Sequence, residues 1–201
     1  VSILSMAALY IEFIWLVRWW GRTVYQQPQI LQDFGLVKNG RTGRSVCVGL
    51  AIGWGSLQAM LLAESALGWL VWTPPTLAIS RIVLEGLAIA LGLGFAEELL
   101  FRGWLLNELQ RDYRPVVATS VSAIAYALLH FIKPIAEIQR TLPGFPGLVL
   151  LGFTLVWAKQ KNRQNLGLSI GLHAGLVWSY YMVYVGQLAR YTGQVPIWIT
   201  G

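Results

Sequence analysis

Residues 77–106 read LAISRIVLEGLAIALGLGFAEELLFRGWLL, a long apolar stretch that contains the string Glu97-Glu98-Leu99-Leu100-Phe101-Arg102. A helix needs about 20 mostly apolar residues to cross a bilayer, so this stretch is long enough to do so. An ionisable side chain at membrane depth costs several kcal/mol unless it faces a partner or water. The charged string therefore indicates a functional site within a membrane-embedded helix.

The rest of the chain has the same apolar character. Of its 201 residues, 56% are hydrophobic and only 12% are charged, which is too apolar for a soluble domain of this length. We therefore predict an all-α, polytopic transmembrane helical bundle that forms a single domain over residues 1–201, with a motif-bearing core over residues 76–186. About six spans are expected, at residues 1–17, 45–63, 76–101, 115–132, 146–158 and 167–186.

Basic residues gather in alternate loops between the predicted spans. They are Arg18, Arg22, Lys38, Arg41 and Arg44 in one loop, Arg111 and Arg114 in another, and Lys159, Lys161 and Arg163 in a third. Alternate loops share one face of the membrane, and an excess of Lys and Arg is typical of the cytoplasmic or stromal face. The net charge of +6 is thus explained by orientation in the lipid bilayer, and no nucleic-acid partner is predicted.

Three titratable positions fall within the apolar stretches. The only two histidines, His130 and His173, lie in two later stretches than Glu97 and Glu98. Glu98 and Arg102 are four residues apart, so they are predicted to form an ion pair on one helix face and to have a structural role. Glu97 lies about 100° away round the same helix without a built-in counter-charge, which suits a group that must accept a proton.

The turn around Tyr113 allows the depth of these residues to be compared. If the third span continues through Gln110, the third and fourth spans form an antiparallel hairpin, and Glu97 and His130 lie 16 residues before and 17 residues after Tyr113. A rise of about 1.5 Å per residue then puts them at nearly equal height. His173 lies early in its span, where glycines at 167, 171 and 175 would permit close helix packing.

Other intramembrane chemistries lack their residues. There is no His-Glu-x-x-His zinc motif, Asp33 and Asp112 lie in polar loops, and Ser169 stands near His173 without a glycine elbow. One glutamate and two histidines remain as a catalytic set. Two other readings stay open, namely a non-catalytic membrane scaffold or binding protein that retains this polar network, and a proton-coupled transporter that uses it as a relay.

Three motifs occur in order along the chain: Glu97-Glu98-x-x-x-Arg102, Tyr126-Ala-Leu-Leu-His130, and His173. In these motifs the chain resembles the CAAX protease and bacteriocin-processing family, also called the Abi family, of intramembrane proteases. The resemblance implies an endopeptidase that cleaves membrane-associated or prenylated substrates, with Glu97 and His130 activating a water and His173 stabilising the oxyanion. It also implies Tyr126 as a conservative replacement of the Phe in the second motif.

The chain departs from this family pattern after His173. The Asn or Asp expected four residues later is Val177, so one oxyanion donor is missing, and the neighbouring Trp178 is a candidate replacement through its indole N–H. Zinc bound by Glu97, His130 and His173 is the alternative to a metal-free site. We favour the metal-free reading, and hence no cofactor, because no carboxylate that would orient either histidine is evident from the sequence.

Two short segments, EELLFRGWLL at residues 97–106 and GLHAG at residues 171–175, resemble cyanobacterial or plastid members of the family. The expected location is therefore a bacterial inner membrane, a thylakoid membrane or a plastid membrane.

Overall fold

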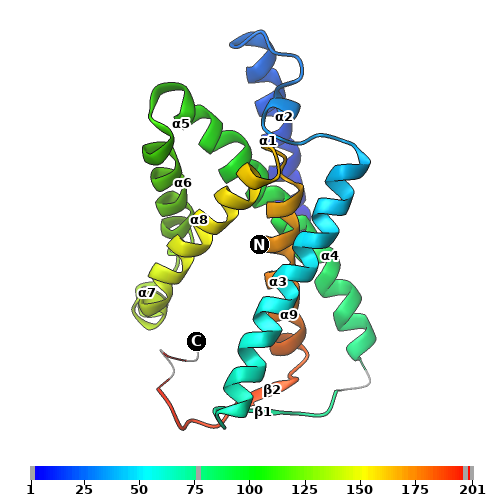
Figure 1. Cartoon of the computed structure of the whole chain (residues 1–201), viewed down its shortest axis with the longest axis vertical. Helices are drawn as coiled ribbons and strands as arrows, with labels where there is room; N and C mark the ends of the chain where they lie inside the picture. Colours follow the sequence, from blue (N-terminus) through cyan, green and yellow to red (C-terminus); the bar gives the residue numbers. More distant parts are fainter. Residues whose placement is uncertain (1–2, 76–77, 197–198, 200–201) are drawn as a thin grey trace.

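The computed structural model describes residues 3–75, 78–196 and 199. Its fold is a helical bundle with one small sheet, which confirms the predicted class (Figure 1). The elements are α1 (Ile3–Thr23), α2 (Ile30–Asp33), α3 (Gly40–Ala66), β1 (Leu70–Trp72), α4 (Ile79–Glu98), η1 (Leu99–Leu105), α5 (Leu106–Asp112), α6 (Pro115–Leu129), α7 (Ile135–Thr141), η2 (Leu142–Gly144), α8 (Phe145–Lys161), α9 (Gly167–Val185) and β2 (Ala189–Tyr191). Segment η1 is π-helical and η2 is a 3-10 turn.

The number of spans is lower than the six predicted. Within the described residues, 4 helices are long and apolar enough to cross a membrane, namely Gly40–Ala66, Ile79–Asp112, Ile135–Lys161 and Gly167–Val185. The span expected at 115–132 forms α6, whose 15 residues fall short of the roughly 20 that a bilayer requires. The span expected at 1–17 begins at residues 1–2, outside the described residues, and overlaps α1.

The fifth expected span is longer than predicted. Residues 146–158 belong to a continuous helical stretch, Ile135–Lys161, in which α7, η2 and α8 follow one another. Pro143 lies in the 3-10 turn and Pro146 in the first turn of α8, where a missing amide donor costs no intrahelical hydrogen bond. The two prolines therefore lie where the helical stretch passes from α7 to α8 and changes direction (Figure 1).

The tightest packing in the bundle joins α3 to α9. A Cβ added to Gly49 would meet backbone atoms of Leu168 and Leu172, and one added to Gly53 would meet those of Leu172 and Leu176. The contacts advance in the same direction on both helices, so α3 and α9 run parallel. The predicted close packing is also found from the other side, where a Cβ at Gly171 would overlap the backbone of α3.

We expect Gly53→Ala to destabilise the protein by about 1–3 kcal/mol, because the added methyl group overpacks a seam with no room for it. The matched control is Gly55→Ala on the same helix, where an added Cβ meets nothing within 4 Å. Unfolding by SDS in mixed micelles measures both variants. Equal loss of stability in the two would contradict the close approach of α3 and α9.

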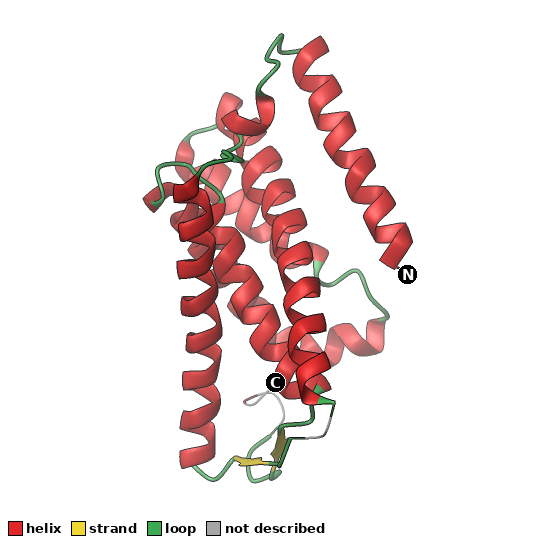
Figure 2. Ribbon diagram, turned by 90° about the vertical axis from the view of Figure 1, so that its right-hand side faces the viewer, coloured by secondary structure: helices red, strands yellow, loops and turns green. Residues whose placement is uncertain are grey.

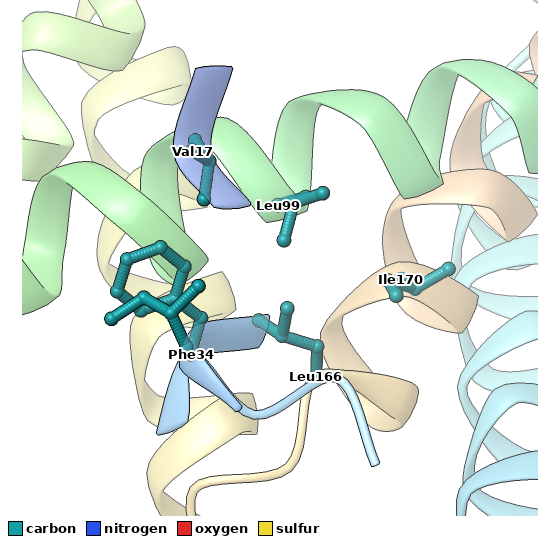
Figure 3. Close-up of a cluster of buried hydrophobic side chains, with 6 residues drawn as sticks. Val17, Phe34, Leu99, Leu166 and Ile170 are labelled. Carbon is teal, nitrogen blue, oxygen red and sulfur yellow. The ribbon is translucent and has the colours of Figure 1, made fainter. Parts of the chain in front are cut away.

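An apolar cluster fixes the part of the bundle that carries η1. It consists of Val17, Ile30, Phe34, Leu99, Leu166 and Ile170, which come from four separate parts of the chain (Figure 3). Phe13 of α1 also packs edge-on against Trp104 of η1, with ring centroids 6.3 Å apart. Through these contacts the C-terminal half of α1 is held on the bundle, while its N-terminal end stands apart from the other helices (Figure 2).

The two ends of the bundle are built differently. At one end, β1 and β2 pair antiparallel, with Val71 opposite Arg190. At the other end lie the turn between α5 and α6, the start of α3 and the connection from α8 to α9 (Figure 1). That second end carries the loops that were predicted to be basic.

Candidate active site

The three predicted catalytic side chains converge. Glu97 lies in the last turn of α4, His130 follows the last residue of α6, and His173 lies in the second turn of α9. The Glu97 Oε2 atom is 4.0 Å from His130 Nε2 and 3.9 Å from His173 Nε2. It is buried and accepts no hydrogen bond from the described residues. A carboxylate oxygen therefore faces two imidazole nitrogens across gaps too wide for direct bonds.

The hairpin predicted at Tyr113 explains why Glu97 and His130 meet. The helical stretch that begins at Ile79 continues to Asp112, and α6 begins at Pro115. Tyr113 between them has extended backbone angles, φ −120° and ψ 154°, which reverse the chain. Glu97 and His130 then lie at the same height on neighbouring helices, as the residue count from the turn predicted.

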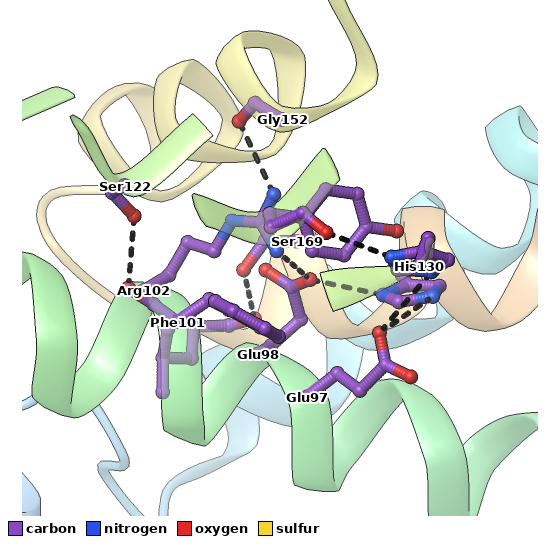
Figure 4. A network of polar contacts seen from close by, with 11 residues as sticks. Glu97, Glu98, Phe101, Arg102, Ser122, His130, Gly152 and Ser169 are labelled. Atoms are coloured by element: carbon purple, nitrogen blue, oxygen red, sulfur yellow. Dashed lines mark hydrogen bonds and ion pairs between the residues drawn. The ribbon is translucent and has the colours of Figure 1, made fainter. Parts of the chain in front are cut away.

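A second network, formed by the buried side chains of Glu98, Arg102 and His173, supports the site. Glu98 Oε1 accepts a hydrogen bond from Arg102 Nη1 at 3.0 Å and one from His173 Nδ1 at 2.9 Å. Neither the Glu98 nor the Arg102 side chain is exposed at all. The predicted Glu98–Arg102 pair is confirmed (Figure 4). The contact of Glu98 with His173 was missed.

The hydrogen bonds of the two histidines fix where their protons lie. Nδ1 of His130 lies 2.8 Å from the carbonyl oxygen of Tyr126, and Nδ1 of His173 lies 2.9 Å from an oxygen of the Glu98 carboxylate. Because a carbonyl oxygen and a carboxylate oxygen can only accept a hydrogen bond, both Nδ1 atoms carry a proton. In neutral His130, Nε2 is therefore a bare acceptor that faces Glu97. His173 offers an Nε2–H donor only as the imidazolium.

Tyr126 lies at the centre of the cluster. Its ring centroid is 4.5 Å from that of His130 and 6.0 Å from that of His173. The Arg102 guanidinium lies over the same ring, 4.2 Å from the centroid, and also donates to the carbonyl of Gly152 at 3.3 Å. The aromatic ring thus packs against the guanidinium and both imidazoles, while Glu98 bridges Arg102 and His173.

The π-helical segment η1 brings in residues that the sequence did not indicate. A π-turn changes the spacing of backbone hydrogen bonds, and such turns are frequent at functional sites. In η1 the carbonyl of Phe101 accepts a hydrogen bond from Ser122 Oγ at 3.1 Å, and that of Arg102 accepts one from Lys159 Nζ at 2.7 Å. Ser122 and Lys159 are buried and tie α6 and α8 to the helix that carries the glutamates. No signal in the sequence indicated the contact of Ser122, and the assignment of Lys159 to a basic loop is wrong, since this lysine is buried in α8 and bonds a backbone atom far away in sequence.

The candidate role of Trp178 as an oxyanion donor does not fit its position. Its indole Nε1 donates to the carbonyl of Val83, near the far end of α4, at 2.9 Å. The ring also lies against Trp54, with centroids 6.5 Å apart. Trp178 therefore joins three helices, and its N–H is already used. Val177 supplies no side-chain donor in its place.

The three side chains of the site are spaced more widely than the ligands of a preformed zinc site. Within the described ranges no group of three or more His, Cys, Asp or Glu side chains is arranged to hold a metal ion. Ligands of a tetrahedral zinc with bonds of about 2.1 Å lie about 3.4 Å from one another, whereas Glu97 Oε2 is 3.9 and 4.0 Å from the two imidazole nitrogens. One premise of the metal-free prediction is nevertheless wrong, since Glu98 is a carboxylate that orients His173.

Comparison with known proteins identifies the family. No curated protein and no solved structure gives a significant match to this chain. Residues 77–179, just over half of the chain, match the family described as type II CAAX prenyl endopeptidase Rce1-like. The matched segment contains all three converging side chains and the Glu98–Arg102 pair. This integral membrane protein therefore belongs to the Rce1-like family of type II CAAX prenyl endopeptidases.

Proposed function

We propose that this protein is an intramembrane endopeptidase that hydrolyses its substrate with a water molecule activated by Glu97 and His130, without a metal ion. One observation carries the proposal: the buried Oε2 of Glu97 has no hydrogen-bond partner among the described residues, yet faces an imidazole nitrogen on each of two other helices. Two hydrogen bonds of about 2.8 Å that one water donates at an angle of about 105° span about 4.4 Å between their acceptors. The observed 4.0 Å between Glu97 Oε2 and His130 Nε2 lies between this span and the roughly 3.4 Å that separates two zinc ligands, so chelation of metal decides between the two.

The proposed hydrolysis uses two hydrogen-bond acceptors, Glu97 Oε2 and His130 Nε2, which hold one water molecule between them. A water there donates one proton to Glu97 and the other to the bare Nε2 of His130, which leaves an oxygen lone pair for the scissile carbonyl carbon. Glu97 takes up a proton as the carbon–oxygen bond forms. The proton then passes to the leaving nitrogen as the carbon–nitrogen bond breaks, and the second water proton is taken up by Nε2 of His130, which yields a carboxylate and an amine.

His173 is the candidate donor to the oxyanion. As the imidazolium, it presents Nε2–H toward the Glu97 side of the site while Nδ1–H stays on Glu98. Glu98 is then a positioning residue, because it orients the ring and balances its charge without touching the substrate. Preorganised donors of this kind are worth several kcal/mol in a site that excludes water.

Tyr126 supplies the donor that Val177 lacks. Its ring contacts both imidazoles, and its phenol hydroxyl is a neutral hydrogen-bond donor, the chemistry that the missing Asn would have provided. The family motif usually has a Phe at the position of Tyr126, so the phenol hydroxyl is an additional hydrogen-bond donor in this chain. The same site lacks the donor that an Asn at position 177 would provide.

We expect Tyr126→Phe to lower kcat by about tenfold to a hundredfold with little change in KM, because the hydroxyl acts on charge that develops in the transition state. The ring, with its contacts to Arg102 and the histidines, is retained. Tyr180→Phe, an exposed tyrosine on α9, is the matched control. A kcat that is unchanged in Tyr126→Phe would exclude the hydroxyl from the reaction.

The substrate class is taken from the family. Its description as a CAAX prenyl endopeptidase favours peptides that end in a prenylated Cys-a-a-X sequence, held at the membrane by their lipid. The test is incubation of the purified protein in lipid nanodiscs with a farnesylated Cys-a-a-X peptide, with release of the C-terminal tripeptide followed by mass spectrometry. Release that zinc chelators do not affect supports both parts of the proposal. Release that chelators abolish and zinc restores would overturn the metal-free mechanism.

A further inference from the structure

A basic hollow of about 400 Å³ lies between the start of α3 and the connection from α8 to α9. Arg41 and Arg44 line it from α3, and Lys161 and Arg163 line it from the other side. The two sides are joined by a hydrogen bond of 3.1 Å from Ser45 Oγ to Asn162 Oδ1. These six residues form a surface separate from the active site, and we call it the basic hollow.

The charge of the basic hollow is not balanced from within. None of its four cations forms an ion pair with the described residues. An adjoining hollow of about 220 Å³ shares Arg41 and Arg163 with the basic hollow and is also lined by the acidic residue Asp33. Four cations thus line one recess whose own lining holds no carboxylate, which leaves an attraction for an anion.

The position of the basic hollow places it at the membrane surface. It occupies the first turns of the candidate span Gly40–Ala66 and the last residue of the candidate span Ile135–Lys161. Two apolar side chains, Val48 and Leu168, complete its wall, and Val48 is 45% exposed. The basic side chains thus lie at the level of the lipid headgroups, and the apolar surface of Val48 and Leu168 begins about one helical turn deeper in the membrane.

We propose that the basic hollow binds the phosphate of an anionic phospholipid, with an acyl chain along Val48 and Leu168. Arginine forks match phosphate oxygens bidentately, and basic pockets between spanning helices are suited to lipid headgroups. A bound headgroup contacts α3 and the α8–α9 connection together, so it reinforces the Ser45–Asn162 contact that holds the start of α9. The site would be filled from the bilayer, since its apolar wall gives no advantage to a free inorganic ion.

The experiment compares the purified protein in micelles with added phosphatidylglycerol, phosphatidylcholine or inorganic phosphate. Bound lipid is counted by native mass spectrometry, and the midpoint of thermal unfolding is recorded. We expect phosphatidylglycerol alone to bind and to raise the midpoint by several degrees. Each arginine near an anionic surface contributes about fivefold to binding, so Arg44→Gln with Arg163→Gln should weaken it about 25-fold.

The control removes the same charge at a distance, through Arg140→Gln with Arg190→Gln, two exposed positions outside the basic hollow. If this control weakens lipid binding equally, the lipid is held by diffuse electrostatic attraction and not by the basic hollow.

If phosphatidylcholine binds equally well, the basic hollow does not require a net negative charge on the lipid. If inorganic phosphate raises the unfolding midpoint equally, the bound phosphate need not belong to a lipid. If the double variant does not fold, Arg44→Gln alone, with an expected fivefold loss, decides the question against Arg190→Gln.

Discussion

Replacing Glu97 with Gln is expected to lower the rate of peptide cleavage by about a hundredfold to ten-thousandfold and to leave the fold intact. The amide keeps the size of the side chain but no longer accepts a proton, and loss of a general base has an effect of this order. Stability is expected to be unchanged or slightly raised, because Oε2 of Glu97 has no hydrogen-bond partner among the described residues that the substitution would remove. Single-turnover cleavage and thermal unfolding measure the two effects.

The control for this prediction is Glu85→Gln on the same helix. Glu85 is 45% exposed and pairs with Arg81 at 3.3 Å, as the i,i+4 spacing indicated, and it lies about three turns from the site. Its substitution should not change the rate. A non-catalytic scaffold would behave differently: the unmodified protein would cleave no peptide, and Glu97→Gln would lower the unfolding midpoint by removing part of a structural network. Cleavage that persists at the normal rate in Glu97→Gln would refute the role given to this residue.

The sequence predicted the parts of the site that depend on distances along one or two neighbouring helices. Glu98 and Arg102 are one helical turn apart, and Glu97 and His130 are equally far from the turn at Tyr113, so simple helix geometry was sufficient for both pairs. The contact between Glu98 and His173 joins residues 75 apart in sequence. It depends on how α9 packs between α3 and α4, and this packing is set by backbone contacts at glycines.

The same limit explains the wrong number of spans. Hydropathy located the apolar segments, but it did not show that α6 stops after 15 residues or that the helix before α8 continues through two prolines. Nor did it predict the π-helical turn at residues 99–105, which depends on donors from Ser122 and Lys159 to two backbone carbonyls. Such features are decided by tertiary partners and not by the local composition of the segment.

Replacing Arg102 with Met is expected to have the largest effect on stability, a loss of about 3–5 kcal/mol. The guanidinium is fully buried, bonds Glu98 Oε1 and the Gly152 carbonyl, and lies over the ring of Tyr126. Its removal leaves the Glu98 carboxylate buried with only His173 as a partner. Unfolding by SDS measures the loss, and Arg81→Met, which removes an exposed arginine from the pair with Glu85, is the control with an expected effect below about 1 kcal/mol.

The double variant Glu98→Gln with Arg102→Met separates the two functions of this pair. If the pair contributes mainly by cancelling charge, removing both charges should cost clearly less than removing Arg102 alone, because neither ion of the pair is then left without the other. The proposed mechanism also requires Glu98 to stabilise the imidazolium of His173, so cleavage by the double variant should stay low even where its stability recovers. Recovery of both stability and activity would mean that Glu98 only neutralises Arg102 and does not act through His173. Recovery of stability alone is therefore the result that distinguishes a positioning residue from a structural ion pair.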